Sequence, residues 1–205
     1  MDAATSVKGA GLVAIAGALV AAAPASVPVL KPIDRTALQR LISVDLHRLQ
    51  AGTEFRGIAV LGGFRIVLPR GERVVRATLP GYLSVALMTN RGRCFFAAAD
   101  YVDGRLTSPT IKHATCSTPP MATAAGEMPG RRLAGEAWGY RAWVDERDGT
   151  TLLTKSRGAT VQELATVRMR TIGLGAIDSP DSPLSNITLV GSTMEGNLML
   201  VLALR

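Results

Sequence analysis

The chain has 205 residues, of which 47% are hydrophobic and 19% are charged, and its formal net charge is +7. This length suits one domain of ordinary size, and so apolar a composition excludes an intrinsically disordered chain. The 21 glycines and 11 prolines are close to average, which excludes collagen-like and low-complexity proteins as well.

An uncharged stretch lies close to the N-terminus. Residues 9–23 are apolar or small, Lys8 precedes them, and Ala23-Pro24-Ala25 fits the A-x-A pattern of a cleavage site. This layout is typical of a secretory signal peptide cut after Ala25. Because no other stretch is apolar for as long, a protein with several membrane spans is excluded.

The N-terminal pattern sets the expected organisation of the whole chain. We expect a signal peptide over residues 1–25, an extended linker over 26–33 and a single β-rich domain over 34–205. Two alternatives remain open. The apolar stretch is long enough for an uncleaved anchor if it continues to Leu30, and a buried helix of a cytosolic protein has a similar length.

A helix is predicted over Arg35–Gln50. Asp34 is a suitable N-cap, Ile33 and Leu38 are spaced as a hydrophobic staple, and Gly52 follows the last apolar position. The apolar residues recur on one stripe, so we expect this helix to pack on the sheet that follows it.

Short β-type segments alternate with turn signals after this helix. The expected turns are Gly62-Gly63, Asn90-Arg91-Gly92 and Asp103-Gly104. The strands expected around them are Gly57–Leu61, Phe64–Leu68, Val74–Leu79, Tyr82–Thr89, Arg93–Ala99 and Thr110–Thr115.

The second half of the chain begins with a loop over residues 117–136, which is rich in Pro, Ala and Gly and has no periodicity. Loops of this length in compact domains are functional or disordered. A hairpin around Asp148-Gly149 comes next, and Thr160 with Glu163, spaced as a capping box, predicts a second helix over Val161–Thr171. After a turn-rich loop over 178–185, strands are expected at Ile187–Val190 and Leu198–Leu204, the last apolar enough to be central in a sheet.

These elements predict a mainly β protein with two helices, in the α+β class. We expect an antiparallel sandwich- or barrel-like sheet of short strands with the N-terminal helix packed on it. The strands and helices do not alternate as they do in a doubly wound parallel sheet.

The two cysteines, Cys94 and Cys116, are expected to form one disulfide if the protein is exported. In the chain-entropy model such a bond stabilises the fold by about 3 kcal/mol. The alternative is a pair of buried free thiols.

Positive charge is concentrated in residues 31–76, where nine basic residues stand against four acidic ones. Such a patch can meet anionic lipid headgroups, acidic glycans or nucleic acid, although a GC-rich genome also explains many arginines. Nucleic acid is not expected as a partner, because no aromatic residues interleave with these arginines as stacking platforms. The densest part consists of Arg65, Arg70, Arg73 and Arg76.

The strongest candidate for a binding site contains aromatic residues. On a strand, Trp138 and Tyr140 share one face and Trp143 lies on the other. An exposed aromatic pair beside guanidinium groups can stack on a sugar or on a partner's side chains, whereas the alternative is that these rings belong to the core. The candidate binding residues are Trp138, Tyr140, Arg131, Arg132 and Arg141.

No catalytic residue, metal site or cofactor is assigned from the sequence. The chain has two histidines, His47 and His113, without a metal-ligand spacing, and it lacks the nucleophile elbow and the phosphate-binding loop. One alternative is a hydrolase in which His113 acts with an Asp and a Ser that only the fold brings near.

We therefore expect a periplasmic or secreted, non-enzymatic domain of a bacterial cell envelope. It would bind a protein or glycan partner through its surface or through the 117–136 loop, and it would contact the membrane only if the N-terminal segment is uncleaved. A second possibility is an accessory subunit of an envelope assembly such as a pilus or secretion machine, anchored in the inner membrane.

Overall fold

The structure, a computed structural model, describes residues 26–43, 58–81, 84–98, 101–102, 105–107, 110–116, 128–176 and 186–204. The expected signal peptide over residues 1–25 and the expected loop over 178–185 lie outside the described residues. No helix in the part that is described is long and apolar enough to cross a membrane.

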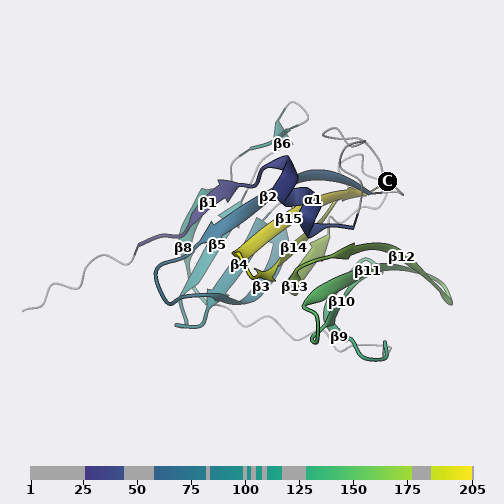
Figure 1. The fold of residues 1–205 in the computed structure, drawn as a ribbon. Helices are drawn as coiled ribbons and strands as arrows, with labels where there is room; N and C mark the ends of the chain where they lie inside the picture. Colours follow the sequence, from purple (N-terminus) through teal and green to yellow (C-terminus); the bar gives the residue numbers. More distant parts are fainter. Residues whose placement is uncertain are drawn as a thin grey trace, which may run out of the picture.

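Antiparallel strands dominate the described fold (Figure 1). The central sheet has the order β1-β2-β15-β14-β13 and consists of Val29–Pro32, Ile58–Val67, Gly196–Leu204, Asn186–Thr193 and Arg170–Ala176. A second sheet has the order β12-β11-β10-β9, with Thr160–Val167, Thr150–Arg157, Tyr140–Asp145 and Arg132–Ala137. A third has the order β3-β4-β5-β8, with Val74–Gly81, Ser84–Thr89, Cys94–Ala98 and Thr110–Ala114. A small pair, β6 and β7, joins Tyr101–Val102 to Arg105–Leu106, and the helix α1 is Arg35–Leu41.

The central sheet is buried on both of its faces. Leu200 and Leu202 of β15 belong to one apolar cluster, which is completed by α1 and the second sheet. Met199 of the same strand belongs to another cluster, shared with Phe95 and other residues of the third sheet. This explains why β15 is almost continuously apolar, and it confirms the expectation that this strand is central.

A register shift in β2 moves its side chains from one cluster to the other. Val60 lies in the first cluster and Phe64 in the second, and the pairing with β15 shifts between Val201 and Leu202. The expected turn at Gly62-Gly63 is therefore wrong, because the strand continues through it. A Cβ on Gly63 would overlap the tip of the Leu38 side chain of α1, so the glycine lets Leu38 pack directly on this strand.

The first helix is confirmed at its start but is shorter than expected. Asp34 caps it by accepting a 2.9 Å hydrogen bond from the Ala37 amide, and Leu38 packs on the core. Ile42 is extended and forms a β-bridge with Val167, which ends the helix at Leu41.

The expected second helix over Val161–Thr171 is wrong, since these residues belong to β12 and β13. Gly158, with φ of 59°, lies in a two-residue turn after which β12 pairs back on β11. The β-branched residues at 161, 166, 167 and 171 favour this strand geometry. What resembled a capping box is the beginning of a hairpin strand.

Three further expectations need correction. The linker over 26–33 contains the edge strand β1, and the second part of the 117–136 loop is strand β9, whereas residues 117–127 lie outside the described part. The barrel alternative is wrong, because the strands form separate sheets that do not close. The hairpins around Asn90-Arg91-Gly92 and Asp148-Gly149 are confirmed.

Candidate functional site

An exposed tryptophan occupies the turn between β9 and β10. Trp138 and Gly139 are the two central residues of this turn, and Ala137 pairs with Tyr140. Their φ values are 53° and 75°, as a type I′ turn requires. The Trp138 side chain is 54% exposed. The sequence placed Trp138 on a strand, and the structure places it at the hairpin tip instead.

The backbone conformation of Trp138 is unusual for its residue type. Among the described residues, it is the only non-glycine with positive φ. This conformation costs an L-residue about 1–2 kcal/mol, and Asn or Asp normally occupies this place before glycine. A strained and solvent-exposed aromatic residue is typical of a functional contact.

Neighbouring strand β11 holds this turn in place. The Lys155 ammonium donates a 2.9 Å hydrogen bond to the Trp138 carbonyl oxygen and lies 3.5 Å from the centre of the Tyr140 ring. The Ser156 amide donates a 2.9 Å hydrogen bond to the Gly139 carbonyl oxygen. The tryptophan is thus presented on a fixed backbone.

A second exposed apolar side chain lies at the same end of the sheet. Val161 is exposed and pairs with Ser156, which itself bonds to Gly139. We call Trp138, Gly139, Lys155 and Val161 together the tryptophan end.

The structure does not bring the predicted arginines to Trp138. Arg132 lies at the opposite end of β9, about 20 Å along the strand, and both its Nε and Nη2 bond to Glu146 Oε1 at 2.9 and 2.8 Å. Arg131 bridges to Met128 beside it. The Arg141 Nε lies 3.0 Å from Glu136 Oε2, so this guanidinium is also paired.

Sequence reasoning missed Lys155 as the cation of this site. The predicted turn at Asp148-Gly149 already fixes which residues of β10 and β11 lie opposite each other. Its register pairs Asp145 with Thr150 and, five residues further, Tyr140 with Lys155. Trp143, in contrast, is buried, and Tyr140 is half-buried and packs against the first apolar cluster, so the alternative of a core position applies to these two rings and not to Trp138.

No family model, curated protein or solved structure matches the chain. The site is therefore defined by its own geometry.

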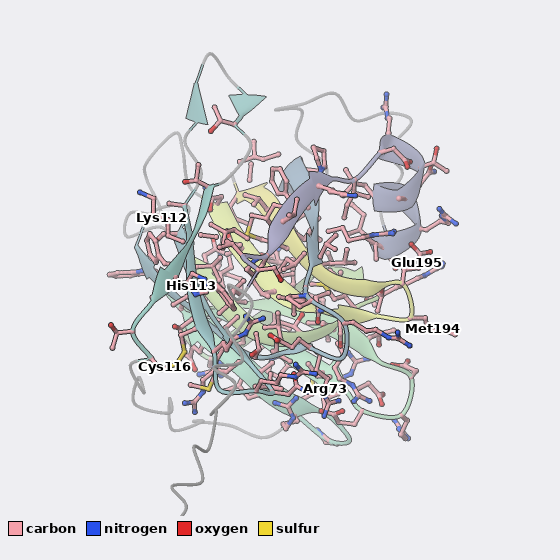
Figure 2. The ribbon with its side chains drawn as sticks, turned by 90° about the vertical axis from the view of Figure 1, so that its left-hand side faces the viewer. Arg73, Lys112, His113, Cys116, Met194 and Glu195 are labelled. Atoms are coloured by element: carbon pink, nitrogen blue, oxygen red, sulfur yellow. A yellow bond between two sulfur atoms is a disulfide. The ribbon has the colours of Figure 1, made fainter. Side chains whose placement is uncertain are left out.

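The predicted arginine patch lies at the other end of the molecule. Arg65 of β2 pairs with Glu195 at 3.1 Å, and Arg73 lies in the turn before β3, where its amide bonds to Asn90. The Val74 amide, next to Arg73, donates a hydrogen bond to Asn197, so this turn lies close to the β14–β15 turn with Met194 and Glu195. Arg73, Met194 and Glu195 are labelled in Figure 2. Arg70 is exposed in the same turn, whereas Arg76 is half-buried within β3.

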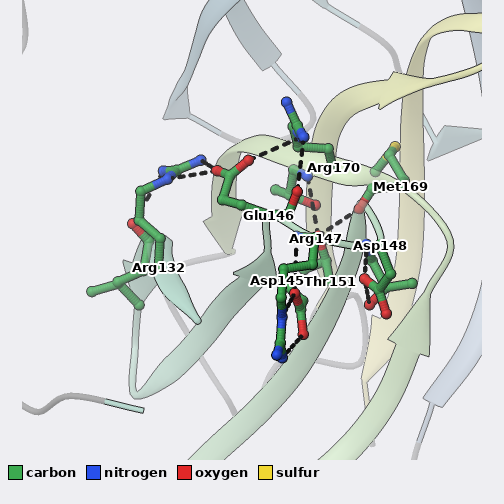
Figure 3. A network of polar contacts seen from close by, with 11 residues as sticks. Arg132, Asp145, Glu146, Arg147, Asp148, Thr151, Met169 and Arg170 are labelled. Carbon is green, nitrogen blue, oxygen red and sulfur yellow. Dashed lines mark hydrogen bonds and ion pairs between the residues drawn. The ribbon is translucent and has the colours of Figure 1, made fainter. Parts of the chain in front are cut away.

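The fold adds arginines from the C-terminal half of the chain to this patch. One carboxylate, Glu146, joins Arg132 to Arg170, whose Nε lies 3.1 Å from Glu146 Oε2 (Figure 3). Arg168 lies in the turn before β13, and its side chain is exposed. We call the turns over 69–73, 90–92, 145–149, 168–169 and 193–196, with the strand ends beside them, the arginine end.

One carboxyl at the arginine end has a perturbed pKa. The Arg147 guanidinium and amide bond to Asp145, at 3.0–3.2 Å, and lower the pKa of this carboxyl from its ordinary 3.8 to about 2. This pair fixes the β10–β11 turn and leaves the carboxylate charged at neutral pH.

The disulfide between Cys94 and Cys116 is present, with a Cα–Cα distance of 5.2 Å. It joins the start of β5 to the residues after β8. Such a bond is consistent with an oxidising, extracytoplasmic compartment.

His113 is exposed on β8, and its ring packs beside Phe95 with 5.0 Å between centroids. Among the described residues it has no carboxylate partner, so this geometry does not favour the hydrolase alternative. Within the same part of the chain, no group of three or more His, Cys, Asp or Glu side chains could hold a metal ion.

Proposed function

We propose that this protein is an exported, non-enzymatic domain of a bacterial cell envelope that binds a protein partner through its tryptophan end. The observation that carries the proposal is Trp138 itself, exposed at a hairpin tip in a backbone conformation that its residue type disfavours. A residue that served the fold alone would be Asn or Gly at this position.

A protein partner fits the site better than a glycan. The cation that contacts this turn, Lys155, is already bonded to the Trp138 carbonyl oxygen. A large, rigid aromatic side chain with apolar Val161 nearby suits insertion into an apolar pocket of a protein, where tryptophan is a frequent hot spot.

Export is supported by two features that do not depend on each other. The uncharged residues 9–23 have the layout of a signal peptide. The Cys94–Cys116 disulfide is of the kind that persists in oxidising compartments. In the anchored alternative the same domain stays attached to the inner membrane through its N-terminal segment.

The first experiment tests export in the native host. Cell fractionation and mass analysis of the purified chain should give a periplasmic or secreted protein that begins after residue 25. Cys94 and Cys116 should react with a thiol-specific polymer only after reduction. An intact chain in the membrane fraction selects the anchored alternative, and an intact, reduced chain in the cytosol contradicts the proposal.

The second experiment tests the tryptophan end. A benzophenone amino acid is placed at position 138 and, as a matched control, at the exposed Lys112 of β8, which belongs to another sheet. Illumination of living cells should give a discrete protein adduct from position 138 and none from position 112. Equal labelling at both positions, or none at 138, contradicts partner binding through this tip.

A further inference from the structure

The arginine end carries a large excess of positive charge. Its basic residues outnumber its acidic ones by ten to five. All five carboxylates are engaged, four of them with arginines and Asp148 with the Thr150 amide. The ten are Arg65, Arg70, Arg73, Arg91, Arg93, Arg131, Arg132, Arg147, Arg168 and Arg170; the five are Glu72, Asp145, Glu146, Asp148 and Glu195.

Three exposed arginines at this end have no ion-pair partner in the described part of the chain, namely Arg70, Arg73 and Arg168. Arg168 and Arg170 line an open depression of about 520 Å³, together with the hydroxyl side chains of Thr150, Ser192 and Thr193. Asp148 also lines it, and its carboxylate accepts hydrogen bonds from the Thr150 amide and hydroxyl at 2.8 and 2.7 Å. Guanidinium donors in an open depression suit a phosphate group.

Exposed apolar side chains lie among these arginines. Met194 is fully exposed in the β14–β15 turn, at the rim of the depression. Val67 at the end of β2 and Val75 at the start of β3 are exposed too, and Val29 of β1 pairs with Val67. Apolar side chains within a ring of cations are typical of surfaces that lie at the headgroup level of a bilayer.

The chain enters the described fold at this same end. β1 is antiparallel to β2, and its first residue, Val29, pairs with the last residue of β2. Val29 comes six positions after Ala23, the end of the apolar stretch, and this segment spans at most about 20 Å. While that stretch is held in a membrane, in export or as an anchor, the arginine end is the part of the fold that lies nearest the lipid.

We propose that the arginine end docks on a bilayer surface of anionic phospholipids, with headgroup phosphates on the free arginines and Met194 at the interface. A soluble polyanion would use the arginines but would gain little from Met194 and the valines. The tryptophan end lies at the other end of the β9–β12 sheet and remains free on the docked protein. The inference does not depend on the proposed partner.

The test measures binding of the full chain to vesicles. Every variant keeps residues 1–25, and vesicles of phosphatidylglycerol with phosphatidylcholine are compared with phosphatidylcholine alone. The test variant is Arg70→Gln with Arg73→Gln and Arg168→Gln. The control removes three exposed charges elsewhere by Arg40→Gln, Lys112→Gln and Arg157→Gln.

Each arginine near an anionic surface contributes about a fivefold change in affinity, so the test variant should bind anionic vesicles about a hundredfold more weakly. The control should change this affinity by less than about threefold. Equal losses in the two variants, or equal binding of the wild type to both kinds of vesicle, would overturn the proposal.

A second variant separates lipid from other polyanions. Met194→Gln should weaken the vesicle binding that persists at high salt and leave binding to dextran sulfate unchanged. If dextran sulfate is bound as tightly as anionic vesicles and Met194→Gln has no effect on either, the ligand is a soluble polyanion and the membrane proposal fails.

Discussion

The indole nitrogen of Trp143 donates a 3.0 Å hydrogen bond to the hydroxyl of Thr154, and both side chains are buried between β10 and β11. Thr154→Val keeps the shape of the side chain but leaves the indole N–H without its partner. We expect a loss of about 1–3 kcal/mol in the free energy of unfolding, measured by urea denaturation. Thr160→Val, on the exposed part of β12, is the control and should change it by less than about 0.5 kcal/mol.

Gly173 of β13 faces the backbone of β3. A Cβ at this position would overlap the carbonyl oxygen of Ala77, and a backbone atom cannot move aside cheaply. Gly173→Ala should therefore lower the free energy of unfolding by about 1–3 kcal/mol or more. Gly63→Ala is the comparison, because its new methyl group meets side-chain tips and no backbone atom, and the nearest of them, Leu38, can rotate. A larger loss from Gly63→Ala would contradict this close approach of β13 to β3.

The pair between Asp145 and Arg147 predicts a pH dependence of stability. Arg147 lowers the pKa of Asp145 in the folded protein to about 2, below its ordinary 3.8. The stabilisation is therefore fully present above about pH 4 and is lost as the pH falls from there toward 2. In thermal unfolding scans, Asp145→Asn should flatten the fall of the midpoint between pH 4 and 2. A variant with the wild-type slope would contradict this assignment.

We expect that Trp138 lowers the free energy of unfolding of the protein. Trp138→Asn places the residue type preferred in a type I′ turn at the tip, so we expect the free energy of unfolding to rise by about 1 kcal/mol. Calorimetry gives the change, and the same variant should fail to bind the partner. A destabilised variant would show that the indole packs on the fold and would remove the argument from backbone strain.

Removal of the disulfide should cost about 3 kcal/mol, measured by denaturant unfolding of a variant with both Cys94→Ser and Cys116→Ser. Reduced wild-type protein should unfold at the same denaturant concentration as this variant. Because the bond joins paired strands β5 and β8, the folded structure should persist. No change in stability on reduction would mean that the bond does not form in the protein.

The sequence predicted the local elements of the fold better than their partners. The hairpin at Asp148-Gly149 was predicted from the residue types of its turn. The disulfide was predicted because the chain has just two cysteines. The helix predicted from Thr160 and Glu163 failed because these residue types also begin a strand, and the pairing with β11 decided between the two.

For the candidate sites too, the sequence identified single residues better than their neighbours in the fold. Trp138 was identified as a candidate, but its place in the turn depended on Gly139 alone, since tryptophan is not a turn residue. Arg168 and Arg170 lie near Arg65 and Arg73 only because of the strand order of the central sheet. Sequence patterns do not predict that order. Local sequence patterns do not reveal long-range strand pairing. The predicted patch therefore lacked the arginines that the fold adds to the arginine end.

The position of β15 between β2 and β14 has a consequence for the order of assembly. β2 lies about 130 residues before β15 in the chain, and within the central sheet it is joined to β14 and β13 through that strand. A growing polypeptide cannot close either apolar cluster until residues 196–204 have left the ribosome. Such distant pairing slows folding. In the export that we propose, slow folding would keep the emerging chain unfolded until it reaches a translocation channel.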